Sequence, residues 1–313
     1  MAIAIHTDSV DPAPLEKWAR MQRLDLIRVP NAGTAEQILG DVAVHAFESR
    51  DIPKLLRQMR WSLKNGRHNV RIRLEGDLRS RAAFEAATER LQRLGYITRC
   101  CQKGDIFSCG IPSAGKGHVD DRLARFLGGG WLEVGALTLA KDVLCGRAMV
   151  IQPNVEVRAG DRHAEFDLLA LPSDGGTPLV VECKSGSGVE QYFLRFAAIC
   201  RMAGASGAHA VLLVRDIDAQ VAADASCLHG FTILTPGQFG EHLRSLFGID
   251  AHRTTEPGST NSAERLQIIE PRSTSVQTLP IKGGAASEPP PAAEPSSQPV
   301  SKREGLLHRL FGH

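Results

Sequence analysis

The sequence predicts an α/β protein with a small N-terminal α/β domain, a second α/β domain and a C-terminal tail that does not fold. Strand-like and helix-like segments alternate up to about residue 250, which is typical of α/β domains. Beyond that point the composition shifts to Pro, Ser, Thr, Ala and Glu, which cannot bury enough apolar surface to fold. We therefore expect domains at residues 1–112 and 113–250, a disordered linker at 251–300 and a short tail at 301–313.

Hydrophobic periodicity predicts the elements of the first domain. Alternating apolar residues indicate strands, amphipathic runs that end at Gly66 and Gly95 indicate helices, and Lys103-Gly104 indicates a hairpin turn. The expected elements are strands at 24–30 and 41–47, a helix at 52–66, a strand at 68–76, a helix at 80–95 and a hairpin at 96–111.

Charge is concentrated within this first domain. The net charge of +2 indicates no partner by itself, but residues 54–103 hold 13 Lys and Arg against 4 Asp and Glu. Such a block can form a phosphate-binding face for nucleic acid. The same residues are equally typical of solvated helix surfaces, so both interpretations stay open.

The second domain is predicted in the same way. Apolar runs bounded by turn residues indicate its strands, and amphipathic runs indicate its helices. The expected elements are helices at 119–127 and 131–144, strands at 154–160, 163–171 and 178–185, a helix at 189–203, strands at 208–216 and 231–235, and a helix at 236–248.

An unusual pair of charges ends the apolar strand "PLVVECKS". Because side chains alternate across a strand, Glu182 and Lys184 share one face, whereas Val181 and Cys183 share the other. A solvated ion pair on an edge strand would also explain the two charges. It would not explain their place at the end of so apolar a run, where burying a pair costs desolvation.

The preceding strand, "HAEFDLLAL", carries two acids. The same alternation places Glu165 and Asp167 on one face and predicts that Phe166 and Leu168 share the opposite, core-facing one. The intervening "LPSDGGTP" is a strong turn signal that predicts an antiparallel hairpin. Asp167 is then the cross-strand neighbour of the charged pair that ends the next strand.

Two carboxylates that converge on one point repel each other unless a cation lies between them. Hard oxygen ligands without Cys or His favour Mg²⁺ or Mn²⁺ over zinc. A lysine beside a metal-bound water can position that water and offset the charge that builds on a phosphoryl oxygen. Asp167, Glu182 and Lys184 therefore predict hydrolysis of a phosphodiester.

Further candidates flank this trio. Glu133 begins a helix after three glycines that allow close backbone approach, which makes it a candidate third acid. Gln191 and Tyr192, after the Lys184 strand, are candidates for orienting water, and Arg195 is a candidate for holding a phosphate.

In order, Glu133, Asp167 and Glu182-x-Lys184 resemble the PD-(D/E)xK, or restriction-endonuclease-like, nuclease superfamily. The strings "FLGGGWLE", "EFDLL" and "VVECKSG" look more narrowly like the nuclease domain of CRISPR-associated ancillary nucleases, which in those proteins follows a CARF sensor domain. The resemblance covers roughly residues 118–240. Residue 166 is phenylalanine where the name of the superfamily has proline, and residues 1–112 carry no CARF fingerprint.

The resemblance implies a restriction-endonuclease-like domain with a central mixed sheet and the activity of a metal-dependent endonuclease of DNA or RNA, with a role in phage defence. It implies Asp167 and Glu182 as metal ligands and Lys184 as the catalytic lysine, while Glu133 and Glu165 match accessory acids. A homodimer would supply the two such sites that cutting two strands usually takes. The alternative is a non-enzymatic nucleic-acid-binding or adaptor protein with a degenerate nuclease fold.

Other motifs give weaker signals. "GIPSAGKG" at 110–117 approaches a P-loop, but glycine stands where a Ser or Thr hydroxyl would meet Mg²⁺, so a linker is preferred. Cys100, Cys101 and Cys109, considered with His118, fit no zinc spacing. The absence of CxxC pairs and of secretory or membrane-spanning runs leads us to expect a reduced, cytoplasmic protein.

The tail ends in an amphipathic segment. Leu306, Leu307, Leu310 and Phe311 would share one face of a helix. Such an end could dock on a protein groove, a membrane surface or the body of the chain, or could have no role.

Overall fold

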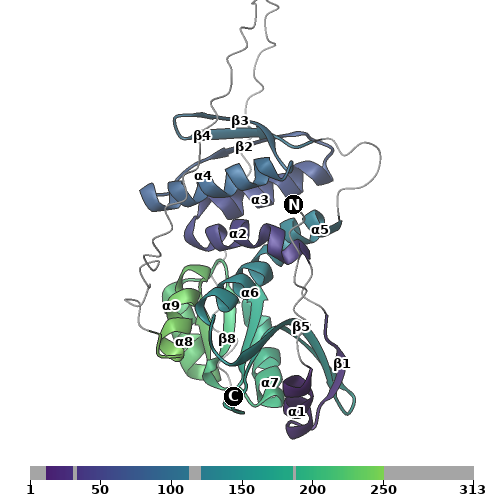
Figure 1. Cartoon of the computed structure of the whole chain (residues 1–313). Coiled ribbons are helices and arrows are strands. Elements are labelled where there is room, and N and C mark those ends of the chain that lie inside the picture. The colour runs from purple at the N-terminus through teal and green to yellow at the C-terminus, as the bar shows by residue number, and fades with distance from the viewer. Residues whose placement is uncertain (1–11, 31–33, 113–120, 186–187, 250–313) are drawn as a thin grey trace, which may run out of the picture. The chain divides into compact units, whose positions relative to one another are not determined.

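The computed structural model describes residues 12–30, 34–112, 121–185 and 188–249 (Figure 1). The described residues belong to one compact unit that extends from Met1 to Glu256. The expected linker and amphipathic tail, and most of the P-loop-like segment, lie outside the described residues. Within the described ranges, no helix has both the length and the apolar content that crossing a bilayer requires.

A six-stranded sheet forms the larger part of the fold, and its mixed strand directions confirm the central mixed sheet that the resemblance implies. The strands are β1 (Asp25–Arg28), β5 (Met149–Ala159), β6 (Arg162–Pro172), β7 (Leu179–Lys184), β8 (Gly207–Val214) and β9 (Phe231–Leu234), in that spatial order. The first four strands pair antiparallel, and β8 and β9 extend the sheet in parallel. The hairpin expected between residues 171 and 179 is confirmed by the antiparallel pairing of β6 with β7.

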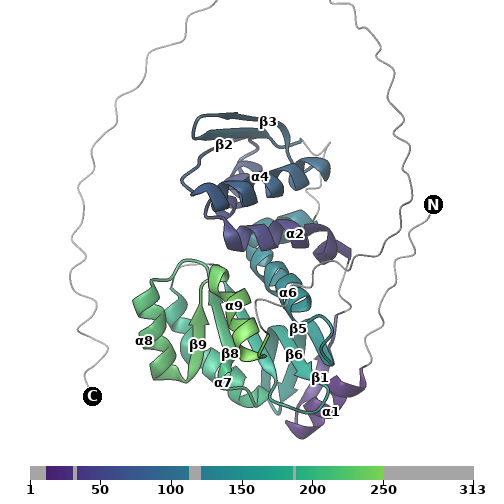
Figure 2. The same cartoon turned by 60° about the vertical axis from the view of Figure 1, so that its left-hand side comes forward.

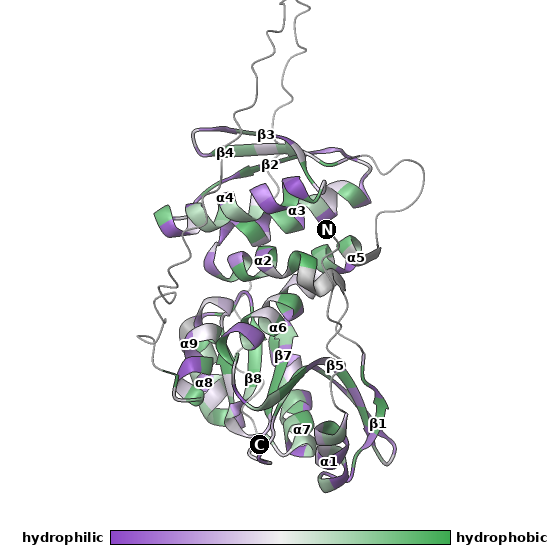
Figure 3. Ribbon diagram, viewed as in Figure 1, coloured by the Kyte–Doolittle hydropathy of each residue, from purple (hydrophilic) through white to green (hydrophobic). Residues whose placement is uncertain are grey.

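Helices cover both faces of this sheet. On one face lie α6 (Trp131–Val143) and α9 (Pro236–Leu246), and on the other α1 (Ala13–Met21), α7 (Phe193–Ala203) and α8 (Ala219–His229). Strands β7 and β8 are apolar along nearly their whole length, as strands covered on both faces need to be (Figure 3). The charged end of β7 is therefore held by a rigid scaffold.

The rest of the N-terminal half forms a second layer structure. It consists of α2 (Thr34–Glu48), α3 (Asp51–Lys64), α4 (Leu78–Arg93) and a three-stranded antiparallel sheet of β2 (Asn69–Arg73), β4 (Ile106–Gly110) and β3 (Thr98–Lys103). The elements α3, α4, β2, β3 and β4 correspond to the helices, the strand and the hairpin that the sequence predicts, with boundaries shifted by a few residues. The sequence did not predict the helices α1, α2 and α8.

The two halves share one core across helices α2 and α6 (Figure 2). The rings of Phe47 and Trp131 meet edge to face at 6.1 Å. A Cβ at Gly135 would lie 2.4 Å from the Phe47 ring, so glycine is what lets the two helices approach this closely. Strand β1 also crosses the expected boundary at residue 112, because it pairs with β5 in the larger sheet.

The strand predicted at residues 41–47 is wrong, because these residues belong to helix α2. The buried residues around this segment recur with the helical spacing of three and four, which explains the error. They are Leu39, Val42, Ala43, Ala46 and Phe47. The alternation of Val and Ala at the centre of this run imitates a strand, but the longer window has the helical period.

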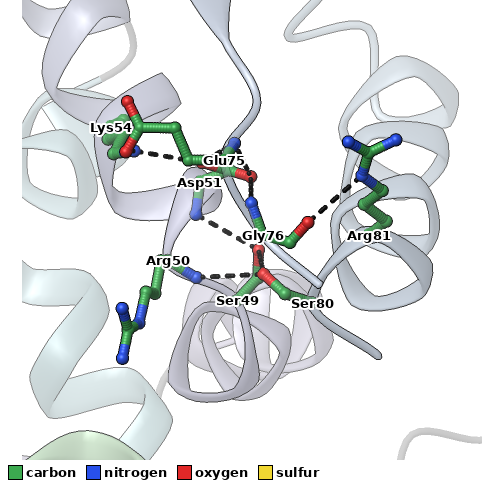
Figure 4. A network of polar contacts seen from close by, with 8 residues as sticks. All are labelled: Ser49, Arg50, Asp51, Lys54, Glu75, Gly76, Ser80 and Arg81. Carbon is green, nitrogen blue, oxygen red and sulfur yellow. Dashed lines mark hydrogen bonds and ion pairs between the residues drawn. The ribbon is translucent and has the colours of Figure 1, made fainter. Parts of the chain in front are cut away.

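A buried carboxylate joins α3 to the turn that follows β2 (Figure 4). Asp51 is 0% exposed and accepts hydrogen bonds from the backbone N–H groups of Glu75, at 3.0 Å, and Gly76, at 2.9 Å. The Lys54 ammonium lies 3.2 Å from the same carboxylate and 2.6 Å from that of Glu75. The charge of Asp51 is thus compensated by donors from two segments far apart in the sequence.

Replacing Asp51 with alanine should lower the free energy of unfolding by about 3 kcal/mol, because two partly buried N–H groups lose their acceptor and the Lys54 ion pair loses its buried partner. Urea denaturation monitored by circular dichroism measures the effect. The matched control is Glu75→Ala, which removes only the exposed side of the Lys54 contact and should change stability by less than about 1 kcal/mol. Equal effects of the two substitutions would contradict the role given to Asp51.

Candidate active site

Strand β7 places Glu182 and Lys184 on one face, as their spacing predicts. The Lys184 Nζ lies 2.5 Å from Glu182 Oε1, and the two side chains are only 25% and 15% exposed. A solvated ion pair on an edge strand is excluded, because β7 lies between β6 and β8. The pair is held inside the protein at the end of a central strand.

Asp167 reaches the same strand from β6. The β6–β7 ladder ends at the pair Leu168–Val181. Just beyond this pair, the backbone N–H of Cys183 donates to Asp167 Oδ2 at 2.7 Å. The carboxylate thus accepts a β7 donor beyond the end of the paired strands, and it lies beside the Glu182–Lys184 pair.

The sequence-based assignment of faces on β6 was wrong in one respect. Phe166 and Leu168 do not share a face: Phe166 packs with Trp18 in one core, with ring centroids 5.9 Å apart, and Leu168 lies in the other core. The ladder to β5 is interrupted opposite Asp167, where Asn154 has a left-handed φ of 49°. The alternation of faces along β6 changes at this point, while the register with β5 is the same on both sides of it.

Glu133 lies in the first turn of α6, directly after a π-helical turn at Phe126–Gly130. Gly129 in that turn has φ 130°, and a Cβ there would lie 2.6 Å from Ser185 Oγ, next to the end of β7. The glycine run therefore allows the close backbone approach that the sequence predicts.

Burial makes these acids weak. It raises the pKa of Glu133 from 4.5 to about 7, and the charges of Asp167 and Glu165 add to the rise. It raises the pKa of Asp167 from 3.8 to about 7, with Glu182 adding to the rise and the Cys183 N–H and Lys184 opposing it. Each carboxylate is thus harder to ionise, chiefly because it is buried and further because of the neighbouring acids.

Glu182 and Lys184 shift each other's pKa. Burial raises the pKa of Glu182, although the adjacent Lys184 ammonium opposes the rise. Burial lowers the pKa of Lys184, but the carboxylates of Glu182 and Asp167 outweigh that effect and raise it. Lys184 therefore remains charged, as an ammonium surrounded by several acids.

A cleft of about 730 Å³ lies beside these residues, and Cys183 and Ser185, the neighbours of Lys184 in the sequence, line it. Glu133 and Glu165 line it together with Ser185 and the three arginines Arg28, Arg60 and Arg125. Sequence reasoning missed Arg28 and Arg60 because they come from β1 and α3. Both lie more than 70 residues before Glu133 and Asp167 in the sequence, so no local pattern relates them to the acids. The excess of basic residues at 54–103 was the one available signal for Arg60.

Gln191 stands apart from this group. It is exposed in the short 3-10 helix Val189–Tyr192, and no hydrogen bond within the described ranges joins it to the acids. Its neighbour Tyr192 lies closer, with the Lys184 Nζ 5.3 Å from the ring centroid. Arg195 opposes the rise in the pKa of Glu182. The role expected for Gln191 stays a prediction.

The residues fit a hard divalent cation by chemistry. Glu182 Oε2 is buried without a hydrogen-bond partner in the described part of the chain, and an unpartnered buried carboxylate oxygen suits a metal ion. Within the described residues, no group of three or more His, Cys, Asp and Glu side chains is arranged so that it could already hold a metal ion. Asp167, Glu182 and Glu133 are the groups that would hold the ion.

Comparison of the chain with protein-family models and with curated proteins finds no match. Several solved structures are similar to it, including the following two. Protein VC1899 from Vibrio cholerae has a TM-score of 0.47 and 15% identity, over 74% of this chain and 60% of that one. Can2 from Sulfobacillus thermosulfidooxidans, solved with cyclic tetra-adenylate, has a TM-score of 0.47 and 12% identity, over 74% of this chain and 59% of that one. This chain spans about 60% of the length of each.

The raised pKa values of Glu133 and Asp167 predict that the metal-free protein loses stability as pH rises through about 5 to 7. In this window the folded state holds protons that the unfolded state has released, so the free energy of unfolding falls by up to about 1.4 kcal/mol per pH unit for each group. Urea denaturation across pH 5 to 8 in EDTA measures the slope.

Asp167→Asn should flatten this slope and stabilise the protein at pH 8, since the amide oxygen can still accept from the Cys183 N–H. Asp161→Asn, at an exposed position in the β5–β6 turn, is the matched control and should leave the slope unchanged. A slope that Asp167→Asn does not alter would contradict the burial of this carboxylate among other acids.

Proposed function

We propose that this chain is a divalent-metal-dependent nuclease of the PD-(D/E)xK type that hydrolyses phosphodiester bonds in DNA or RNA. The observation that carries the proposal is the meeting of Asp167, Glu182 and Lys184 at the end of β7, with Glu182 Oε2 buried and unpartnered. The sequence resemblance to CRISPR-associated nucleases extends the proposal to defence against foreign nucleic acid.

In this proposal Asp167 and Glu182 hold a Mg²⁺ or Mn²⁺ ion, and Glu133 supports it from α6. When bound, the ion supplies Lewis acidity and lowers the pKa of water. Lys184 donates from its ammonium towards the attacking water and the phosphoryl oxygen, where negative charge builds. Lys184 keeps this position because Glu182 Oε1 anchors it.

The arginines supply the substrate contacts. Arg60 is fixed at the cleft by a 3.2 Å hydrogen bond from its Nη1 to the Gly128 carbonyl, and Arg125 lies close enough to lower the pKa of Glu133. Guanidinium groups match phosphate geometry through paired N–H donors. A cleft lined by both acids and arginines suits a phosphodiester with a bound cation better than it suits an uncharged substrate.

Labelled single- and double-stranded DNA and RNA, incubated with Mn²⁺, Mg²⁺ or EDTA, test the proposal. We expect wild-type protein to cut at least one substrate with metal and none in EDTA. The double substitution Glu182→Ala, Lys184→Ala should reduce the rate at least about 100-fold, because it removes a metal ligand and the ammonium that stabilises developing charge.

Glu190→Ala is the control, since it removes an exposed acid from the element that follows β7. It should cut at the wild-type rate. Cleavage that persists in EDTA or in the folded double variant would refute the proposed site. Equal nucleic-acid binding by all three proteins, without cutting in any metal, would favour the adaptor function instead.

A further inference from the structure

Helix α3 presents a surface of unusual composition. All four of its exposed side chains are cationic or aromatic: Arg57, Arg60, Trp61 and Lys64. Their spacing of three and four places them along one side of the helix. The acid of this helix, Asp51, is fully buried at the other end and compensated there.

Trp61 differs from the other tryptophans. Trp18 and Trp131 are 4% and 2% exposed and pack in the two cores, whereas Trp61 is 43% exposed. The guanidinium of Arg67, just beyond the end of α3, lies 4.6 Å from the centroid of the Trp61 ring. A solvated aromatic ring is thus combined with a cation that is not paired with any acid in the described part of the chain.

This surface is continuous with the candidate active site. Arg60 belongs both to the exposed side of α3 and to the lining of the cleft, where Glu133 and Glu165 also lie. Its hydrogen bond to the Gly128 carbonyl connects α3 directly to the turn that precedes α6. A polymer bound along α3 would therefore enter the cleft at Arg60.

We propose that a basic–aromatic stripe, formed by Arg57, Arg60, Trp61, Lys64 and Arg67, binds single-stranded nucleic acid and directs it into the cleft. The cations neutralise phosphates and Trp61 stacks on an unpaired base. This inference rests on the proposed nuclease function, because the strand is directed into the cleft of the candidate active site. It adds that the substrate is single-stranded.

Two arguments favour a single strand over a duplex. Stacking on Trp61 requires a base face that is not already stacked in a helix, which an unpaired strand provides. In addition, residues 57 to 64 span about 10 Å of helix axis, far less than the roughly 34 Å of one turn of a DNA duplex. The stripe matches a few nucleotides of a flexible strand.

Intrinsic tryptophan fluorescence tests the inference in EDTA, where the full-length protein should leave the strand uncut. Single-stranded DNA or RNA oligonucleotides should quench Trp61, and a duplex of the same sequence should not. An abasic strand of equal length should bind without quenching. Trp61→Ala should abolish the quench and weaken binding at least about 5-fold, while Trp61→Phe should retain part of the affinity.

A second pair of variants tests the contribution of positive charge to binding. Lys64→Glu and Arg20→Glu each reverse one exposed basic residue in the last turn of a helix, α3 and α1 respectively. Only Lys64→Glu should weaken binding and reduce the slope of log affinity against log salt, by about 0.7 for one phosphate contact. Equal effects of both substitutions would indicate nonspecific charge and overturn the inference.

The two proposals fail separately. Wild-type protein that cuts single strands no faster than Trp61→Ala and binds them with equal affinity would overturn the stripe and leave the nuclease intact. Quenching and binding through Trp61 without cleavage in any metal would overturn the nuclease and support the stripe. A Trp61→Ala variant that changes self-association in sedimentation, but not oligonucleotide affinity, would assign the stripe to a second copy of the chain and overturn the inference.

Discussion

The burial of several carboxylates around a single ammonium is the constraint on which this structure depends. Burial raises the pKa values of Asp167, Glu182 and Glu133, and the neighbouring acids raise them further. Lys184 compensates only part of the charge. Such an arrangement is costly unless the acids take up protons or a cation. The site therefore has an affinity for positive charge that follows from its position in the fold.

The fold maintains this arrangement because both faces of the large sheet are covered. Apolar residues hold β7 between β6 and β8, so the end of the strand cannot move away from the repulsion. The interruption at Asn154 frees Asp167 from the regular alternation of β6, and its carboxylate accepts from β7 instead. Gly129 brings the start of α6, and with it Glu133, against Ser185. The backbone irregularities at Asn154 and Gly129 thus both lie beside the candidate active site.

The sequence predicted the parts of this site that depend on local rules. Strand alternation related Glu182 to Lys184, and the turn between residues 171 and 179 set the antiparallel pairing that brings in Asp167. It could not predict the reversal of faces between Phe166 and Leu168, because that depends on the conformation of Asn154 in a different strand. The assignment of residues 41–47 to a strand failed because a short apolar run is ambiguous between the two periods.

The contribution of the N-terminal half was the hardest part to predict. Arg28 and Arg60 reach the cleft only because β1 joins the large sheet and α3 packs against the turn before α6. No pattern in the local sequence indicates either contact. The domain boundary expected at residue 112 would separate both arginines from the acids of the second domain. The basic composition of residues 54–103 gave nucleic-acid binding as a hypothesis, and only the packing of α3 relates these residues to the acids.

Calorimetric titration of the protein with Mn²⁺ at pH 6.5, in two buffers of different ionisation enthalpy, tests the central claim most directly. If the buried acids form a cation site, the ion binds and displaces protons from groups whose pKa is about 7. The apparent heat then depends on the buffer, and Asp167→Asn reduces both the affinity and the number of protons released. Absence of saturable binding, or binding that Asp167→Asn and Glu182→Gln leave unchanged, would contradict the account.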